Sequence, residues 1–94
     1  MKKKIVILGA GESGTGSAVL ALRKGFDVFV SDQGQVKEQY KKILEEHKVE
    51  WEEGRHTEEK ILAADEVIKS PGIKEDAPII SQLRGKAIPV ISEI

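Results

Sequence analysis

Residues 5–14 have the sequence IVILGAGESG, in which a short apolar run leads directly into the spacing G-x-G-x-x-G. A continuous apolar run of this length is typical of a strand buried on both faces of a parallel sheet. In such a loop Gly9 permits a tight turn, Gly11 lets a phosphate approach the backbone, and Gly14 lets the next helix pack closely. The stretch therefore predicts a strand, a phosphate-binding loop and a helix, although the spacing also fits a strand–helix turn that binds nothing.

The rest of the chain continues this alternation of strands and helices. Short connections between alternating strands and helices predict a parallel sheet with helices on both faces. Right-handed crossovers favour the strand order 3-2-1-4-5, which is a Rossmann-like three-layer α/β domain with a five-stranded parallel sheet. Apolar and acidic residues alternate in the third strand, as expected at a sheet edge. The further strands are predicted at residues 28–30, 49–53, 66–69 and 88–91, and the helices at about 14–24, 36–47, 57–64 and 78–84.

The composition excludes several classes of protein. The chain has 94 residues, enough for one domain, and its 15 basic and 16 acidic side chains give a net charge of −1. Nucleic-acid-binding proteins usually carry a strong basic excess, so we expect no nucleic-acid partner. The absence of cysteine excludes disulfides, thiol nucleophiles and cysteine-bound zinc. No apolar run approaches the roughly 18 to 20 residues that span a bilayer, so we expect a cytoplasmic domain without membrane contact.

Two polar segments follow strands that should end beside the glycine-rich loop. Asp32 stands 18 residues after Gly14, where an acidic side chain of a dinucleotide-binding domain accepts hydrogen bonds from a ribose hydroxyl. A carboxylate there also suits the N–H edge of a base, or it caps a turn. Gly72, in the segment Ser70-Pro71-Gly72 after the fourth strand, either lets the backbone approach the same ligand or forms a simple turn.

The loop contains two polar side chains, Glu12 and Ser13, each with more than one possible role. A carboxylate repels a pyrophosphate, so we expect Glu12 to turn outward or to meet a sugar or base, whereas Ser13 suits a phosphate or a helix cap. The chain contains neither the P-loop spacing G-x-x-x-x-G-K-[ST] nor an evident Ser–His–Asp set. We expect Thr57 to cap a short helix. The other polar candidates are expected on the solvated surface: His47, His56 and the glutamate pairs 45–46, 52–53 and 58–59.

Four segments resemble the N-terminal domain of the Mur ligases: residues 5–14, 30–32, 67–73 and 91–94. The resemblance extends over essentially all 94 residues. The sequence Ser-Pro-Gly-Ile after the fourth strand distinguishes this family from ordinary dinucleotide-binding domains. Within the family, the chain is most similar to the branch that adds D-glutamate in bacterial peptidoglycan synthesis.

The resemblance implies a three-domain, ATP-dependent amide ligase of which residues 1–94 are the N-terminal fragment. This domain would bind the UDP moiety of UDP-N-acetylmuramoyl-L-alanine. A central P-loop domain would bind ATP and magnesium, and a C-terminal domain would bind D-glutamate. The fragment itself would carry no catalytic residue, no cofactor and no metal, and would be inactive alone. We expect the full-length enzyme to be a monomer.

The resemblance also assigns substrate-binding residues. Glu12 and Ser13 match loop positions that meet the nucleotide, Asp32 and Gln33 match positions near the uracil, and Gly72 matches a backbone contact to it. The chain departs from the family at two positions, because many relatives have a small or apolar residue in place of Glu12 and some have an arginine in place of Gly34. The candidate set for UDP is therefore Gly9, Gly11, Glu12, Ser13, Gly14, Asp32, Gln33 and Gly72.

Two other functions remain open on the residues alone. The glycine-rich loop and Asp32 fit the NAD(P)-binding domain of a dehydrogenase or regulatory protein equally well, although the Ser-Pro-Gly-Ile segment fits it less well. A stand-alone interaction domain without a ligand would explain the fold. It would not explain why Gly11, Asp32 and Gly72 should meet at one edge of the sheet.

Overall fold

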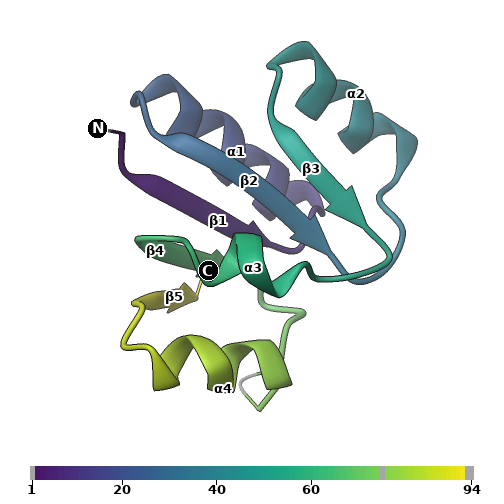
Figure 1. The fold of residues 1–94 in the computed structure, drawn as a ribbon. Helices are drawn as coiled ribbons and strands as arrows, with labels where there is room; N and C mark the ends of the chain where they lie inside the picture. Colours follow the sequence, from purple (N-terminus) through teal and green to yellow (C-terminus); the bar gives the residue numbers. More distant parts are fainter. Residues whose placement is uncertain (1, 75, 93–94) are drawn as a thin grey trace.

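The computed structural model describes residues 2–74 and 76–92, and its five strands form one parallel sheet in the order β3-β2-β1-β4-β5. The predicted order is therefore confirmed. Figure 1 shows the strands fanned between the helices, with α2 at the β3 end of the sheet and α4 at the β5 end. The strands are β1 (Lys4–Leu8), β2 (Asp27–Asp32), β3 (Glu50–Glu53), β4 (Glu66–Lys69) and β5 (Val90–Ser92). The helices are α1 (Glu12–Arg23), α2 (Glu38–Glu46), α3 (Glu58–Ile61) and α4 (Pro78–Gly85).

The central strand β1 separates two apolar cores. Ile5 and Ile7 pack in one core with residues of α1 and α2, whereas Val6 and Leu8 pack in the other with residues of α3 and α4. All four side chains are at most 2% exposed. Because successive side chains of a strand point to opposite faces, a strand covered on both sides needs a continuous apolar run. This explains the sequence of residues 5–8.

The edge strand was also predicted correctly, because β3 pairs only with β2 among the described strands. Other boundaries differ from those expected. Helix α1 begins at Glu12, two residues early, and α3 is a single turn that ends at Ile61. Strand β5 begins at Val90 rather than at residue 88, because the N–H of Ile88 donates to the carbonyl of Leu83 at the end of α4. Among the described residues, no helix is long and apolar enough to cross a membrane.

Candidate functional site

The first and third glycines of the loop are required by packing within the protein. Gly9 has a φ of +100°, and a Cβ on it would lie 2.7 Å from the Cβ of Ser70. A Cβ on Gly14 would lie 1.8 Å from the carbonyl oxygen of Gly9, closer than any side chain tolerates. The turn and the close packing of helix on strand therefore account for both positions.

Gly11 is different, because nothing lies within 4 Å of where its Cβ would stand. Its φ of −82° is also accessible to any residue. The folded chain therefore gives no packing reason for glycine at this position. A group that approaches the backbone from outside, as a phosphate is expected to do, would supply one.

The first turn of α1 presents backbone donors beside Gly11. The N–H of Thr15 donates to the carbonyl of Gly11, which leaves the N–H groups of Glu12, Ser13 and Gly14 without a partner inside the helix. Glu12 and Ser13 are exposed. Ser13 does not cap the helix, because Gly11 occupies the N-cap position. Glu12 lines a shallow groove between α1 and α2 that also includes Tyr40.

Asp32 ties the end of β2 to the glycine-rich loop. Its Oδ2 accepts a hydrogen bond from the N–H of Ala10, and its Oδ1 accepts one from the N–H of Gly34, both at 2.8 Å. The N–H of Gly9 also donates to the carbonyl of Ser31 at 2.8 Å. Asp32 therefore acts as a turn cap in the folded chain. Each carboxylate oxygen retains a further lone pair for a ligand.

The segment after β4 lies next to the glycine-rich loop, on the side opposite to Asp32 and the end of β2. The N–H of Ser70 donates to the carbonyl of Leu8 at 2.9 Å, and the N–H of Gly72 lies 3.4 Å from the hydroxyl oxygen of Ser70. Lys69 is buried and its Nζ donates to the carbonyl of Ile73 at 2.9 Å. These contacts hold the Ser-Pro-Gly-Ile segment in a defined conformation next to the glycine-rich loop.

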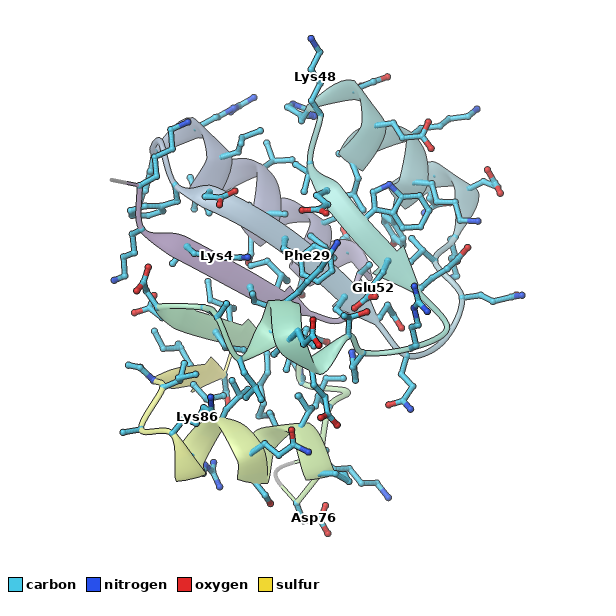
Figure 2. All side chains as sticks on the ribbon, viewed as in Figure 1. Lys4, Phe29, Lys48, Glu52, Asp76 and Lys86 are labelled. Atoms are coloured by element: carbon cyan, nitrogen blue, oxygen red, sulfur yellow. The ribbon has the colours of Figure 1, made fainter. Side chains whose placement is uncertain are left out.

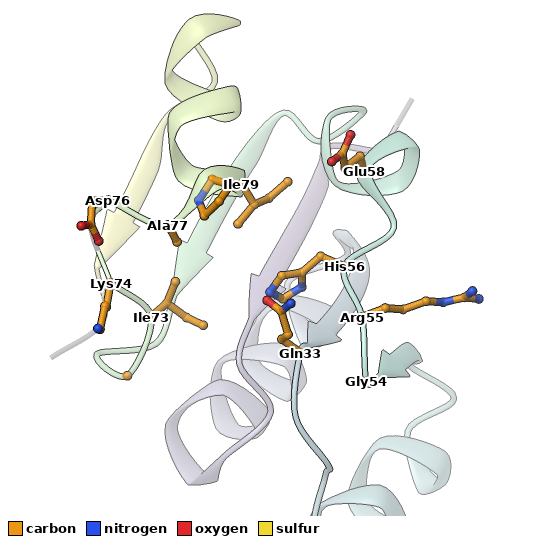
Figure 3. Close-up of a pocket in the computed structure, with 12 residues that line it drawn as sticks. Gln33, Gly54, Arg55, His56, Glu58, Ile73, Lys74, Asp76, Ala77 and Ile79 are labelled. Atoms are coloured by element: carbon orange, nitrogen blue, oxygen red, sulfur yellow. The ribbon is translucent and has the colours of Figure 1, made fainter.

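A cleft of about 680 Å³ opens at this edge of the sheet. Two of the predicted site residues, Gln33 and Gly72, line it. Figure 3 shows Gln33 beside His56, across the cleft from Ile73. The three glycines of the loop, Glu12, Ser13 and Asp32 are not part of this lining. Its other lining residues come from the segment before α3 and its first residue, and from the β4–α4 connection and the start of α4: Gly54, Arg55, His56, Glu58, Ile73, Lys74, Asp76, Ala77, Pro78 and Ile79.

A polar network beside this cleft was not predicted from the sequence. Ser31 is fully buried, and its Oγ lies 2.8 Å from Oε2 of Glu52 and 2.7 Å from Nδ1 of His56. Glu52 also accepts hydrogen bonds from the N–H and the hydroxyl of Thr57. Glu52 is labelled in Figure 2. Its side chain is only 12% exposed, so its assignment to the solvated surface is wrong. His56 is half-buried, so its surface assignment is wrong too.

Thr57 precedes α3 as predicted, but its side chain does not cap that helix. The hydroxyl of Thr57 binds Glu52 because a partly buried carboxylate needs hydrogen bonds more than an exposed helix end does. The register that pairs Ser31 with Glu52 is the signal that could have revealed this network. The predicted strand order pairs the second and third strands but does not specify their register.

The network fixes the charge of its carboxylate. Burial raises the pKa of Glu52, but the hydrogen bonds from Thr57 and Ser31, together with the Arg55 guanidinium, hold it below its ordinary value. Burial lowers the pKa of His56, and the charges of Glu52 and Asp32 only partly oppose this. At neutral pH the site therefore combines an ionised Glu52 with an uncharged His56. The described residues contain no group of three or more side chains that could hold a metal ion.

Comparisons with known proteins agree with this fold. The family model described as MurD N-terminal domain matches residues 4–79. The UDP-N-acetylmuramoylalanine–D-glutamate ligase of Bacteroides fragilis is 64% identical over 92 residues, which are 98% of this chain and 21% of that enzyme. The enzyme of the same name from Christiangramia forsetii is 56% identical over 94 residues, which are 100% of this chain and 21% of that enzyme. The chain thus spans about a fifth of these relatives.

Solved structures show the same architecture. A pseudomurein peptide ligase type C from Methanothermus fervidus matches with a TM-score of 0.82 and 26% identity, over 97% of this chain and 19% of that one. The UDP-N-acetylmuramate-alanine ligase of Thermotoga maritima matches with a TM-score of 0.79 and 23% identity, over 95% of this chain and 20% of that one. The family model covers most of the chain, and the curated relatives cover nearly all of it. The chain therefore belongs to the MurD N-terminal domain family.

Proposed function

We propose that residues 1–94 are the N-terminal, UDP-binding domain of a three-domain ligase that adds D-glutamate to UDP-N-acetylmuramoyl-L-alanine in peptidoglycan synthesis. The observation that carries this proposal is the 64% identity, over 98% of the chain, to a relative named for that reaction. At this level of identity, we expect the glycine-rich loop and the cleft to have the same role in this chain as in those relatives. The larger size of the relatives supports the assignment of this chain to one domain of a longer enzyme.

The geometry suggests where each part of the nucleotide would lie. The uracil would enter the cleft between Gln33 and Gly72, where an amide side chain and a backbone N–H offer both donors and acceptors. The diphosphate would lie over Gly11, facing the unpaired N–H groups of the first turn of α1 and the positive end of its dipole. Ser13 would donate to a phosphate oxygen, and Asp32 would meet the nucleoside between these two ends.

The chemical step would take place outside these residues. The family forms an amide by first converting the substrate carboxylate to an acyl phosphate with ATP, which the amine of the incoming amino acid then attacks. The 94 residues contain no P-loop sequence, so ATP and magnesium would bind elsewhere in the full-length enzyme. This domain would contribute binding energy from the nucleotide end of the substrate, which holds the distant carboxylate in place.

Calorimetric titration of the chain with UDP and, separately, with NAD tests the proposal. We expect saturable binding of UDP, strengthened or unchanged with UDP-N-acetylmuramoyl-L-alanine, and no saturable binding of NAD. The glycine-rich loop and Asp32 would suit either nucleotide, so NAD is the informative competitor. Saturable binding of NAD without binding of UDP would replace the proposal with a dinucleotide-binding function.

A further inference from the structure

The ring of His56 is held in a single orientation at the cleft wall. His56 lines the cleft together with Gln33, from the opposite side to Ile73 and Ile79 (Figure 3). Its Nδ1 lies 2.7 Å from the hydroxyl oxygen of Ser31, which is fully buried. Because Nδ1 and Nε2 lie on different sides of the imidazole, a ring anchored inward through Nδ1 turns Nε2 away from Ser31 and toward the cleft.

The neighbours of Ser31 determine which nitrogen of His56 carries the proton. The hydroxyl of Ser31 has one proton to donate, and the carboxylate of Glu52 at 2.8 Å and the carbonyl of Arg55 at 3.2 Å are acceptors only. If Ser31 gave its proton to His56, its bare oxygen would face the charged oxygen of Glu52. The stable arrangement has Ser31 donating to Glu52 and accepting from Nδ1–H of His56.

It follows that Nε2 of neutral His56 is an unprotonated acceptor. Within the part of the chain that the structure describes, this nitrogen has no hydrogen-bond partner. The charged groups around it are Glu52 on β3 and Asp32 on β2, with Arg55, Glu58, Lys74 and Asp76 on the cleft lining. An acceptor cannot bind a phosphate oxygen, which is itself an acceptor, but it matches the N–H of a base or the hydroxyl of a sugar.

We propose that His56 is a further ligand-binding residue of this site, accepting a hydrogen bond at Nε2 from an N–H or O–H of the nucleoside, with Ser31 and Glu52 as positioning residues. This inference rests on the proposed function, since it assumes that a uridine nucleotide occupies the cleft. It adds a specificity element from the β3–α3 connection to a site otherwise built at the ends of β1, β2 and β4. Three donors on the nucleoside qualify: N3–H of the uracil and the 2′- and 3′-hydroxyls of the ribose.

Nitrogen NMR of the two histidines provides a direct test. The chain contains two histidines, and His47 is a matched internal control because its Nδ1 also binds an oxygen acceptor, the carbonyl of Ile43 at 2.9 Å, on the distant helix α2. In the free protein we expect Nδ1–H and bare Nε2 for His56. On titration with UDP the Nε2 resonance of His56 should shift toward that of a hydrogen-bonded acceptor, while His47 should not change.

Calorimetry on variants tests the energetic role. His56→Phe keeps a planar ring but removes the Nε2 acceptor and also the Nδ1–H that donates to Ser31. We expect UDP to bind about fivefold more weakly, as for the loss of one hydrogen bond to the ligand. His47→Phe should bind UDP like the wild type. Circular dichroism and thermal unfolding of each variant identify any loss of fold. As pH falls through the His56 titration, the ratio of variant to wild-type dissociation constants should approach one, because protonated Nε2 no longer accepts.

Modified nucleotides identify the donor. If N3–H of the uracil is the donor, N3-methyl-UDP should bind wild type and His56→Phe equally, and 2′-deoxy-UDP should retain the fivefold difference. A difference that is retained with N3-methyl-UDP and lost with 2′-deoxy-UDP would assign the ribose 2′-hydroxyl, and a difference retained with both would assign the 3′-hydroxyl. Unchanged His56 resonances and an unchanged affinity in folded His56→Phe, while the wild type binds UDP, would refute this inference and leave the proposed function standing. Failure of the wild type to bind UDP would refute both.

Discussion

Oδ2 of Asp32 accepts a hydrogen bond from the backbone N–H of Ala10 at 2.8 Å, which joins the end of β2 to the glycine-rich loop after β1. The same carboxylate accepts from the N–H of Gly34 through Oδ1, also at 2.8 Å. Both carboxylate oxygens of Asp32 therefore already accept hydrogen bonds from the backbone before any ligand binds. Under the proposed function, the contribution of Asp32 to nucleotide binding would include the shape that it gives to the loop, as well as any direct contact.

Replacing Asp32 should lower stability and UDP affinity together. In Asp32→Ala the N–H groups of Ala10 and Gly34 lose their acceptor, which should cost about 1–3 kcal/mol in the free energy of unfolding. UDP binding should weaken by a similar amount. Urea unfolding and calorimetric titration measure the two effects. Asp27→Ala, an exposed aspartate at the other end of β2, is the control and should change neither quantity. A stable Asp32→Ala variant with unchanged affinity would contradict the assignment of Asp32 to the site.

The two helical glycines Gly14 and Gly16 should respond oppositely to alanine. The Cβ of Gly14→Ala would stand 1.8 Å from the carbonyl oxygen of Gly9, so the loop must move, and we expect a loss of about 3 kcal/mol or more in the free energy of unfolding. The Cβ of Gly16→Ala meets nothing within 4 Å. Because alanine favours a helix interior over glycine, Gly16→Ala should stabilise the chain by up to about 1 kcal/mol. If the denaturant midpoints of both variants moved in the same direction, the close approach of Gly14 to Gly9 would not be the reason why position 14 requires glycine.

Gly11→Val should separate ligand binding from folding. The position has an ordinary φ and open space for a side chain, so the fold should persist, with a loss of about 1 kcal/mol because valine is a poor N-cap residue. The branched side chain would stand where the diphosphate should approach, and UDP affinity should fall at least about tenfold, equivalent to about 1.4 kcal/mol. Circular dichroism verifies the fold and calorimetry measures the affinity. A Gly11→Val variant that binds UDP normally would place the diphosphate elsewhere.

Ionised Glu52 should stabilise the folded protein above mildly acidic pH, and Glu52→Gln should remove this contribution to the free energy of unfolding. The pKa of Glu52 lies below its ordinary value of 4.5, so the folded state prefers the ionised form. The contribution is fully present above the unfolded-state pKa and is lost as pH falls through the lower folded-state pKa. The difference in melting temperature between wild type and Glu52→Gln should therefore be largest near neutral pH and shrink below about pH 4.5.

The matched control for Glu52 is Glu59→Gln, an exposed glutamate in α3. It should leave the melting temperature nearly unchanged across the same pH range. In Glu52→Gln the pKa of His56 should fall further, because the charge of Glu52 raises it in the wild type. A Glu52→Gln difference that is independent of pH would indicate that the side chain matters for packing rather than for its charge.

The extent to which the site was predictable differs between its two halves. The glycine-rich loop, Asp32 and Gly72 were predicted because they follow strand ends, and parallel strands bring their carboxyl ends to one edge. Gln33 was predicted only from the family resemblance. The contacts of Ser31, Glu52 and His56 were not predicted. Glu52 belongs to an acidic pair on an edge strand, which by pattern alone indicates a solvated face. Its side chain is covered because Ser31 and Thr57 turn toward it from a neighbouring strand and from the following loop.

The alternation of strands and helices, and the order of the strands, follow from the amino-acid sequence alone. Apolar runs and helical periodicity are local, and the right-handed crossover rule converts them into a sheet order. The way His56 is held depends on tertiary structure, since residues 31 and 56 are 25 positions apart and meet only when β3 pairs with β2. The contact between Gly14 and the carbonyl of Gly9 is local, and the G-x-G-x-x-G spacing already predicted glycine at position 14. The contact of His56 with Ser31 depends instead on distances across the fold, which no local pattern of residues contains.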